Sequence, residues 1–187
     1  MSSYLLVYGS LLNPLSASAG LLRDIRVSDY IDVTLHDYAL SYNVLERVVM
    51  HQGVIDVCFL NVVPCPDHVL SAKCLKVSQH ELQSLAVREK NYDVVDISKH
   101  IQPEVSERVV AFCGKQACLL PHGEKPMVLK EYMKKVDRGV RQFGHDFSNR
   151  MYSSLNAAAQ GAIIVTGDYS FVSKQQNDLT DCGAHHD

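Results

Sequence analysis

The chain has no tryptophan, and phenylalanine and tyrosine together supply only 7% of its 187 residues. Platforms that stack nucleic-acid bases are built from aromatic side chains, so this scarcity argues against such a ligand. Long blocks of like charge are also missing, because 18 basic and 21 acidic residues are interspersed and leave a formal net charge of −3. Neither nucleic acid nor an anionic membrane surface is therefore expected as a partner, and a small molecule is the more natural one.

The chain also lacks any apolar run long enough to cross a bilayer. Its N-terminal apolar run carries no basic flank and is broken at Tyr8 and Gly9, so it does not read as a secretory signal. We therefore expect a cytosolic protein.

Hydrophobic residues make up 47% of the chain, which is enough for one well-packed domain. We place this domain at residues 1–170, followed by a polar tail at residues 171–187.

Paired cysteine motifs are absent too. The chain has six cysteines, none in a Cys-x-x-Cys pair: Cys58, Cys65, Cys74, Cys113, Cys118 and Cys182. Most lie in apolar, strand-like segments and are expected to be buried free thiols. Cys65 with His68, or Cys113 and Cys118 with His122, could be assembled into a metal site, but zinc sites normally show closely paired ligands. We predict no metal and no cofactor.

The sequence is rich in short strand-like segments. Each contains Val, Leu, Ile or Tyr between polar or turn residues, and they occupy residues 4–8, 30–42, 54–63, 73–77, 93–97 and 108–113. The short connections favour an antiparallel, barrel-like sheet over repeated βαβ units. We therefore predict an α+β fold in which a small, mainly antiparallel β-barrel is flanked by helices.

Helical periodicity occurs in several places. Apolar residues three and four apart predict a helix from Val128 to about residue 143, and Phe147 and Met151 continue the apolar face into a further helix. Residues 78–91 predict another helix and residues 11–25 a short one near the start. Residues 162–165 fit a short edge strand, and residues 174–187 are polar and expected to fray.

The first strand runs into a turn formed by Tyr8, Gly9, Ser10 and Leu11. Glycine permits φ > 0 and close approach of the backbone, so the amides of Gly9, Ser10 and Leu11 could converge on a carboxylate or carbonyl oxygen. The turn could equally serve only to change the chain direction. Ser10 could be a nucleophile, although no Gly-x-Ser-x-Gly elbow surrounds it and no histidine or acid can be assigned as its partner.

An acidic residue, Glu89, falls on the apolar side of the helix predicted at residues 78–91. Ser78 and Glu81 form a capping box that sets the helix start, and the helical repeat then places Glu89 on one face with Leu82, Leu85 and Ala86. A carboxylate on an inward stripe is costly to bury unless it is paired, hydrogen-bonded or protonated, so it is a candidate functional group.

The residues on either side of Glu89, Arg88 and Lys90, are predicted to point elsewhere. Two alternatives to a functional role stay open for Glu89. It could be a helix-end acid that has already turned to solvent, or the ion-pair partner of Arg88 or Lys90.

Three segments, in order, resemble the γ-glutamylcyclotransferase-like family. Residues 7–11, Val-Tyr-Gly-Ser-Leu, are similar to its N-terminal signature; residues 85–92, Leu-Ala-Val-Arg-Glu-Lys-Asn-Tyr, are similar to the segment that carries its catalytic glutamate; and residues 132–139 are similar to its late helix, from which a tyrosine reaches the substrate. The similarity covers residues 4–150. It implies a small β-barrel flanked by helices, with Glu89 as the catalytic residue and Tyr8, Gly9, Ser10, Leu11 and Tyr132 as the substrate-binding residues.

The resemblance also implies a reaction. Such enzymes split a γ-glutamyl amide by attack of its own α-amino group on the γ-carbonyl, which releases 5-oxoproline and an amine, amino acid or dipeptide; glutathione, a γ-glutamyl amino acid or a γ-glutamyl amine would be the substrate. Glu89 would act as the general acid/base and no cofactor would be needed. The alternatives are a non-catalytic module of the same fold that binds a small acidic ligand, or a pure interaction protein. A homo-oligomer stays open.

Overall fold

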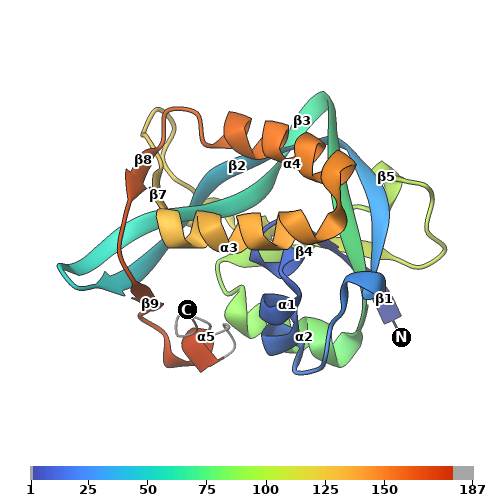
Figure 1. The fold of residues 1–187 in the computed structure, drawn as a ribbon, viewed down its shortest axis with the longest axis horizontal. Helices are drawn as coiled ribbons and strands as arrows, with labels where there is room; N and C mark the ends of the chain where they lie inside the picture. The colour runs from blue at the N-terminus through green and yellow to red at the C-terminus, as the bar shows by residue number, and fades with distance from the viewer. Residues whose placement is uncertain (1, 179–187) are drawn as a thin grey trace.

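The computed structural model describes residues 2–178, which form a curled mixed sheet covered by helices (Figure 1). The sheet has the strand order β4-β6-β1-β3-β2-β5, and β9 pairs with β2 beside this path. The elements, in chain order, are β1 (Ser2–Val7), α1 (Pro14–Leu21), β2 (Tyr30–Met50), β3 (Gly53–Ser78), α2 (Gln79–Arg88), β4 (Tyr92–Asp96), β5 (Ile101–Gln102), β6 (Val109–Gly114), β7 (Met127–Leu129), α3 (Lys130–Val140), α4 (His145–Ala158), β8 (Ile163–Val165), β9 (Tyr169–Phe171) and α5 (Lys174–Asp178).

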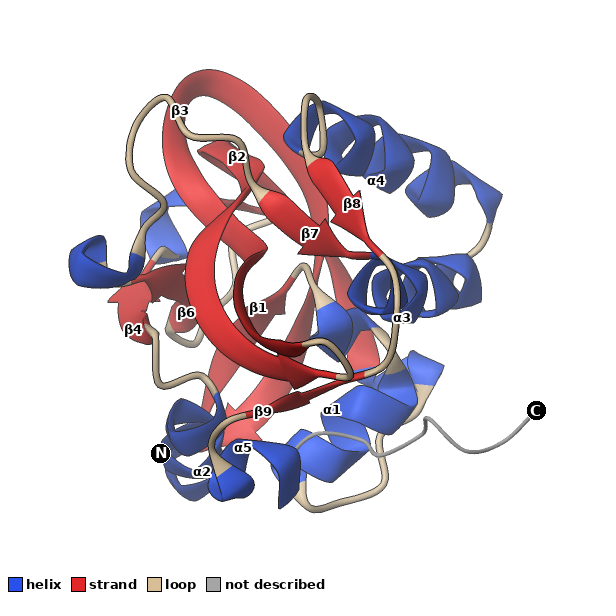
Figure 2. Cartoon of the chain, turned by 90° about the vertical axis from the view of Figure 1, so that its left-hand side faces the viewer, coloured by secondary structure: helices blue, strands red, loops and turns tan. Residues whose placement is uncertain are grey.

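The long hairpin of β2 and β3 is the framework of the sheet. Its strands contain 21 and 26 residues, so three of the segments predicted as separate strands are parts of these two. In β2, buried and more exposed residues largely alternate, as expected of a strand with one face on the core. Register shifts at His36/Tyr38 and Tyr42/Val44 interrupt the pairing. Such bulges increase local twist, which suits a sheet that curls on itself (Figure 2).

The prediction of an α+β fold built on a barrel-like sheet is confirmed, and the sheet is an open half-barrel. β1 pairs antiparallel with β3 and parallel with β6, and antiparallel pairs predominate in the rest of the sheet. A small separate sheet pairs β7 with β8 in parallel, which confirms the edge strand expected near residue 163. The predicted helices near residues 11, 78, 128 and 147 are present as α1, α2, α3 and α4.

Helices α3 and α4 lie side by side against the long hairpin (Figure 1). The position of α3 is set by Gly139, because a Cβ atom there would lie 2.5 Å from the backbone nitrogen of Asn13. Gly139 thus lets α3 contact the backbone of the loop that follows β1. This contact brings Tyr132, on the buried side of α3, toward the same loop.

The polar tail expected from residue 171 is corrected by the structure. Phe171 is the last residue of β9 and pairs with Val48 of β2, and the following helix α5 buries Gln176. These residues therefore belong to the folded domain: β9 pairs with β2, and α5 contacts α2 and β9. Cys182, His185 and His186, which the sequence places in the tail, lie outside the described residues.

Within residues 2–178, every helix is too short or too polar to cross a membrane.

The described cysteines are free thiols, as expected: Cys58, Cys65, Cys74, Cys113 and Cys118. Among them, burial raises the pKa of Cys113 to about 11. At neutral pH that thiol therefore stays protonated and is a poor nucleophile.

Candidate functional site

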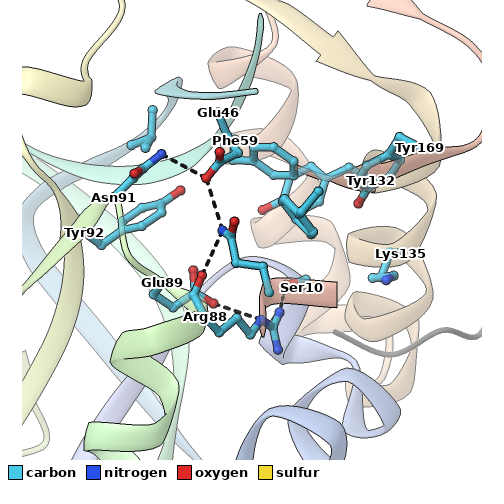
Figure 3. Close-up of a pocket in the computed structure, with 13 residues that line it drawn as sticks. Ser10, Glu46, Phe59, Arg88, Glu89, Asn91, Tyr92, Tyr132, Lys135 and Tyr169 are labelled. Atoms are coloured by element: carbon cyan, nitrogen blue, oxygen red, sulfur yellow. Dashed lines mark hydrogen bonds and ion pairs between the residues drawn. The ribbon is translucent and has the colours of Figure 1, made fainter. Parts of the chain in front are cut away.

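Two adjoining cavities open at the end of β1. The first, here called the loop cavity, is lined by all six residues that the sequence singled out, together with neighbouring side chains: Tyr8, Gly9, Ser10, Leu11, Glu89 and Tyr132. The second, here called the Glu46 cavity, shares Ser10, Glu89, Tyr92 and Tyr132 with the first and adds Glu46, Arg88 and other residues (Figure 3). Segments far apart in the sequence thus meet at one place.

Gly9 is buried where β1 turns into the loop, but its backbone conformation differs from the expectation. Its φ is −118°, a value open to any residue, so φ > 0 is not what requires glycine here. The close approach of Tyr132 is the physical reason instead. A Cβ atom on Gly9 would lie 2.9 Å from the Tyr132 hydroxyl oxygen, tighter than real Cβ contacts.

The loop after Gly9 forms one 3-10 turn, Ser10–Leu12. The amide of Leu12 donates to the Gly9 carbonyl at 3.0 Å and that of Asn13 to the Ser10 carbonyl at 3.0 Å. The first amide that donates within this turn is that of Leu12, so the amides of Gly9, Ser10 and Leu11 take no part in its hydrogen bonds. Within residues 2–178 these three amides have no hydrogen-bond acceptor. These three donors can therefore serve a ligand oxygen in the loop cavity.

Helix α2 begins as predicted, with Ser78 and Glu81 forming a reciprocal capping box. The helix ends at Arg88, and Glu89 is its C-terminal capping residue. The prediction places Glu89 within the helix, on the same face as Leu82 and Leu85. The Glu89 side chain is 20% exposed and lines both cavities. The predicted stripe is otherwise imperfect, because Ala86 is exposed.

Arg88 is the main correction to the sequence prediction, since it points into the site and is 7% exposed. Its Nε lies 3.1 Å from Glu89 Oε1, and its guanidinium donates to Ser10 Oγ at 2.8 Å and to the Ser16 carbonyl at 3.2 Å. It has room because Gly20 of α1 has no side chain: a Cβ there would lie 2.8 Å from Arg88 Nη1. Arg88 thus joins Glu89 to the loop.

The Glu89 carboxyl is in an environment that favours its neutral form. Burial raises its pKa above the ordinary carboxyl value, the Arg88 guanidinium opposes that rise, and Glu46 adds to it. A carboxyl group with a raised pKa beside a ligand cavity is suited to accept and return a proton during a reaction. The arrangement therefore has the chemical means for general acid–base catalysis.

Three tyrosine hydroxyls near Glu89 keep their protons. Burial raises the pKa of Tyr8, Tyr92 and Tyr132 well above the ordinary tyrosine value. The Tyr8 hydroxyl donates to the Phe112 carbonyl at 2.5 Å, and that of Tyr92 to the Leu60 carbonyl at 2.8 Å. These hydroxyls remain neutral around the carboxylate and cannot themselves serve as bases.

A second buried carboxylate, Glu46 of β2, lies in the site and was not found from the sequence. Its Oε2 accepts from Asn91 at 2.9 Å and from Gln176 at 3.1 Å, and its Oε1 lies 3.3 Å from Lys90 Nζ. Lys90 is therefore the second neighbour of Glu89 that turns toward the site, contrary to the prediction. The strand predicted from the sequence ends at residue 42; continued along β2, the alternation of Val44, Glu46 and Val48 would have placed this acid on the inward face.

The structure offers Ser10 no base. Its hydroxyl accepts a hydrogen bond from Arg88, a cation that cannot take up a proton, and the described residues include no histidine or carboxylate bonded to it. A nucleophilic role for Ser10 therefore has no support in the geometry.

Within residues 2–178, no group of three or more His, Cys, Asp or Glu side chains has an arrangement that could hold a metal ion.

Comparison with known proteins places this geometry in a recognised fold. No family model and no curated protein sequence matches the chain. Among solved structures, YkqA from Bacillus subtilis is similar over 88% of this chain (14% identity, TM-score 0.64), although the chain spans only 56% of that protein. A γ-glutamyl cyclotransferase is similar over 96% of this chain and 98% of its own (15% identity, TM-score 0.57).

A γ-glutamyl cyclotransferase specific to glutathione, from yeast, is similar over 99% of both chains, with 12% identity and a TM-score of 0.57. At such identities the likeness concerns the fold. The resemblance read from the three sequence segments is therefore confirmed at that level. The curled sheet and its flanking helices, together with these similar structures, show that the chain has the γ-glutamylcyclotransferase-like fold.

Proposed function

We propose that this protein is a γ-glutamylcyclotransferase-like enzyme that cleaves a γ-glutamyl amide and releases 5-oxoproline. The observation that carries the proposal is the partly buried Glu89 carboxyl, whose pKa is raised and which lines one cavity with three loop amides that have no acceptor within residues 2–178. Two similar structures bear the names of γ-glutamyl cyclotransferases, one of them specific to glutathione. A base and an oxygen-binding loop in one cavity are what this reaction needs.

The substrate supplies its own nucleophile in the proposed reaction. Its α-amino nitrogen forms a bond to the γ-carbonyl carbon, the bond from that carbon to the amide nitrogen breaks, and a five-membered lactam results. Glu89, when ionised, takes the proton that the attacking nitrogen loses and returns it to the departing nitrogen. The protein's remaining task is to hold the γ-glutamyl chain in a near-attack shape.

The other site residues are assigned supporting roles. The amides of Gly9, Ser10 and Leu11 bind a carboxylate or the developing oxyanion of the substrate. Tyr8 and Tyr132 shape the cavity as neutral, buried rings. Arg88 holds the Ser10 side chain and the Glu89 carboxylate to each other, which fixes the distance between base and loop.

The proposal is tested by incubating the protein with glutathione, γ-glutamyl amino acids and γ-glutamyl amines, followed by quantification of 5-oxoproline. Catalytic production from at least one class is expected. Binding of these compounds without 5-oxoproline would contradict the proposal and favour a binding module of the same fold.

Replacing Arg88 with methionine should shift the pH dependence of that activity. Activity requires ionised Glu89, so kcat/KM should rise with pH through the Glu89 pKa, which already lies above the ordinary carboxyl range. Arg88 holds that pKa down, so its loss should move the acidic limb upward by about one pH unit. The measurement is the pH profile of kcat/KM.

Arg88→Lys is the matched control, because it keeps the charge beside Glu89 and should leave the limb closer to its original position. The thermal midpoint must be measured as well, since Arg88→Met removes hydrogen bonds to Ser10 and Ser16. An unshifted limb in an Arg88→Met protein that remains folded would show that Glu89 is not the titrating group.

A further inference from the structure

Helix α5, Lys174–Asp178, buries a polar side chain where a packed helix ordinarily buries an apolar one. Gln176 is 4% exposed and is the residue that this helix buries, while Lys174 and Gln175 are exposed. Burial of an amide requires hydrogen-bond partners to offset the loss of water. The contacts of Gln176 therefore decide what α5 does.

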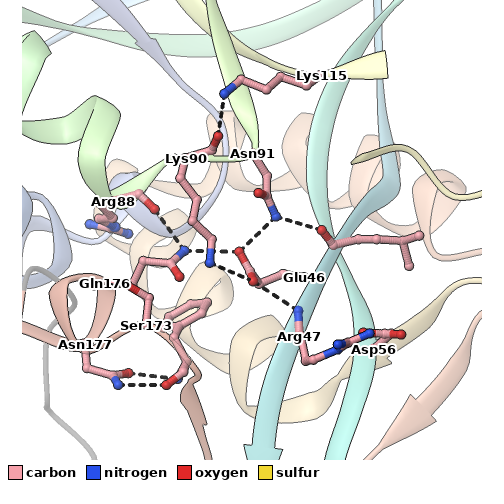
Figure 4. Close-up of polar contacts among 12 residues, drawn as sticks. Glu46, Arg47, Asp56, Arg88, Lys90, Asn91, Lys115, Ser173, Gln176 and Asn177 are labelled. Atoms are coloured by element: carbon pink, nitrogen blue, oxygen red, sulfur yellow. Dashed lines mark hydrogen bonds and ion pairs between the residues drawn. The ribbon is translucent and has the colours of Figure 1, made fainter. Parts of the chain in front are cut away.

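The Gln176 carboxamide binds within the Glu46 cavity (Figure 4). Its Nε2 donates to Glu46 Oε2 at 3.1 Å and to the backbone carbonyl of Arg88 at 3.1 Å. The second acceptor belongs to the residue immediately before Glu89. Gln176 lines the same cavity as Glu89 and Ser10, so its amide lies within the candidate site itself.

The chemistry of this side chain matches that of the proposed substrate. Glutamine carries two methylenes and a carboxamide, which is the γ-glutamyl amide group with an unsubstituted nitrogen. The α-nitrogen of Gln176, however, is part of the peptide backbone and is no free amine. Gln176 therefore presents the group that the enzyme would cleave, in a form that cannot cyclise.

We propose that residues 168–178, here called the strap, hold Gln176 in the site as a built-in substrate mimic, and that a γ-glutamyl compound must displace it to bind. This inference rests on the proposed function, because it identifies the γ-carboxamide as the group that the cavity selects. The strap would thus set the affinity for substrate and favour γ-glutamyl compounds that compete well for Glu46 and the Arg88 carbonyl.

The attachment of the strap defines what such a displacement must break. Two backbone-to-side-chain hydrogen bonds of 2.8 Å join Asn177 to Phe171, so β9 and α5 are held together as a unit. The strap is preceded by Gly167, whose φ of +128° only glycine adopts readily. β9 pairs with β2 through three residues. Tyr169 and Phe171 also contact the Phe59 ring of β3, so displacement of this unit must break these ring contacts together with the pairing of β9.

Gln176→Ala tests the inference, with Gln175→Ala as the matched control on the exposed side of the same helix. Removing the two hydrogen bonds should raise the fraction of protein with an open strap, so the KM for glutathione, γ-glutamylalanine or Nε-γ-glutamyl-lysine should fall by about tenfold with little change in kcat. The control should match the wild type. An unchanged or higher KM in Gln176→Ala would overturn the inference.

A binding measurement separates this inference from the enzymatic proposal. The same compounds are titrated calorimetrically into Glu89→Gln protein, with and without Gln176→Ala. Tighter binding to the double variant supports the strap even if no protein releases 5-oxoproline, an outcome that would contradict only the proposed function. Equal or weaker binding to the double variant, or no binding to either protein, overturns the inference about the strap. If Gln176→Ala releases 5-oxoproline with the KM of the wild type, the inference about the strap is overturned while the proposed function stands.

Discussion

Glu89→Gln is expected to leave the fold intact and to remove nearly all release of 5-oxoproline. A neutral amide has almost the same size as the carboxylate but cannot accept the proton of the attacking amine. General acid–base catalysis typically contributes about 100- to 10,000-fold, so turnover should fall by a factor in that range. The measurement is kcat for the best γ-glutamyl substrate, with circular dichroism as a check of folding.

The same substitution should not lower stability at neutral pH. The pKa of Glu89 is raised in the folded state, so its stabilising contribution is present at acid pH and is lost as the pH rises through the folded pKa. An uncharged glutamine avoids that loss, and the unfolding midpoint should be equal to or above that of the wild type. This outcome would separate a chemical defect from a folding defect.

Glu46→Gln is the matched comparison, because Glu46 is the second carboxylate of the site and is buried. It should retain most of kcat, because no proton transfer is assigned to Glu46, whereas KM should change because the substrate carboxamide is proposed to bind this side chain. Turnover above about a tenth of wild type in Glu89→Gln, combined with a larger loss in Glu46→Gln, would transfer the proton-carrying role to Glu46.

Gly9→Val is expected to reduce kcat/KM by about 100-fold, the size of effect that a misplaced reactive group produces. The Tyr132 hydroxyl lies only 2.9 Å from the position that a Cβ on Gly9 would take, so the branched side chain must push α3 or the loop away. Both the loop amides and the wall formed by Tyr132 would then be displaced from Glu89. The expected effect arises from crowding between the new side chain and the Tyr132 hydroxyl.

A double-mutant cycle checks this cause. In Gly9→Ala, removal of the Tyr132 hydroxyl by Tyr132→Phe should recover part of the lost activity, because the nearest atom to the new Cβ is then absent.

Ser10→Ala should reduce kcat/KM less than Gly9→Val does. A reversed order, with a covalent adduct on the wild-type protein by mass spectrometry, would make Ser10 a nucleophile.

The sequence by itself determined the local structure and part of the site. The capping box of Ser78 and Glu81 predicts the start of α2, because both partners lie within one turn. Alternating and helical periodicities predict the four longer helices and parts of most strands, since each pattern reflects one buried face, but they do not predict the short strands β5, β7 and β9 or the full length of β2 and β3. The Gly9 turn and Glu89 stood out because a glycine after an apolar strand and an acid on an apolar stripe both conflict with a simple core.

The tertiary structure alone decided what surrounds Glu89. Arg88 follows Leu85 by three residues, as Leu85 follows Leu82, so it shares their buried face, but only the packing of α1 on α2 provides the space at Gly20 that its guanidinium needs. Glu46 and Gln176 meet across 130 positions of sequence because the sheet curls and β9 pairs with β2. Local patterns report which face of an element is buried, whereas the partner of a buried charge depends on long-range packing that brings distant elements together.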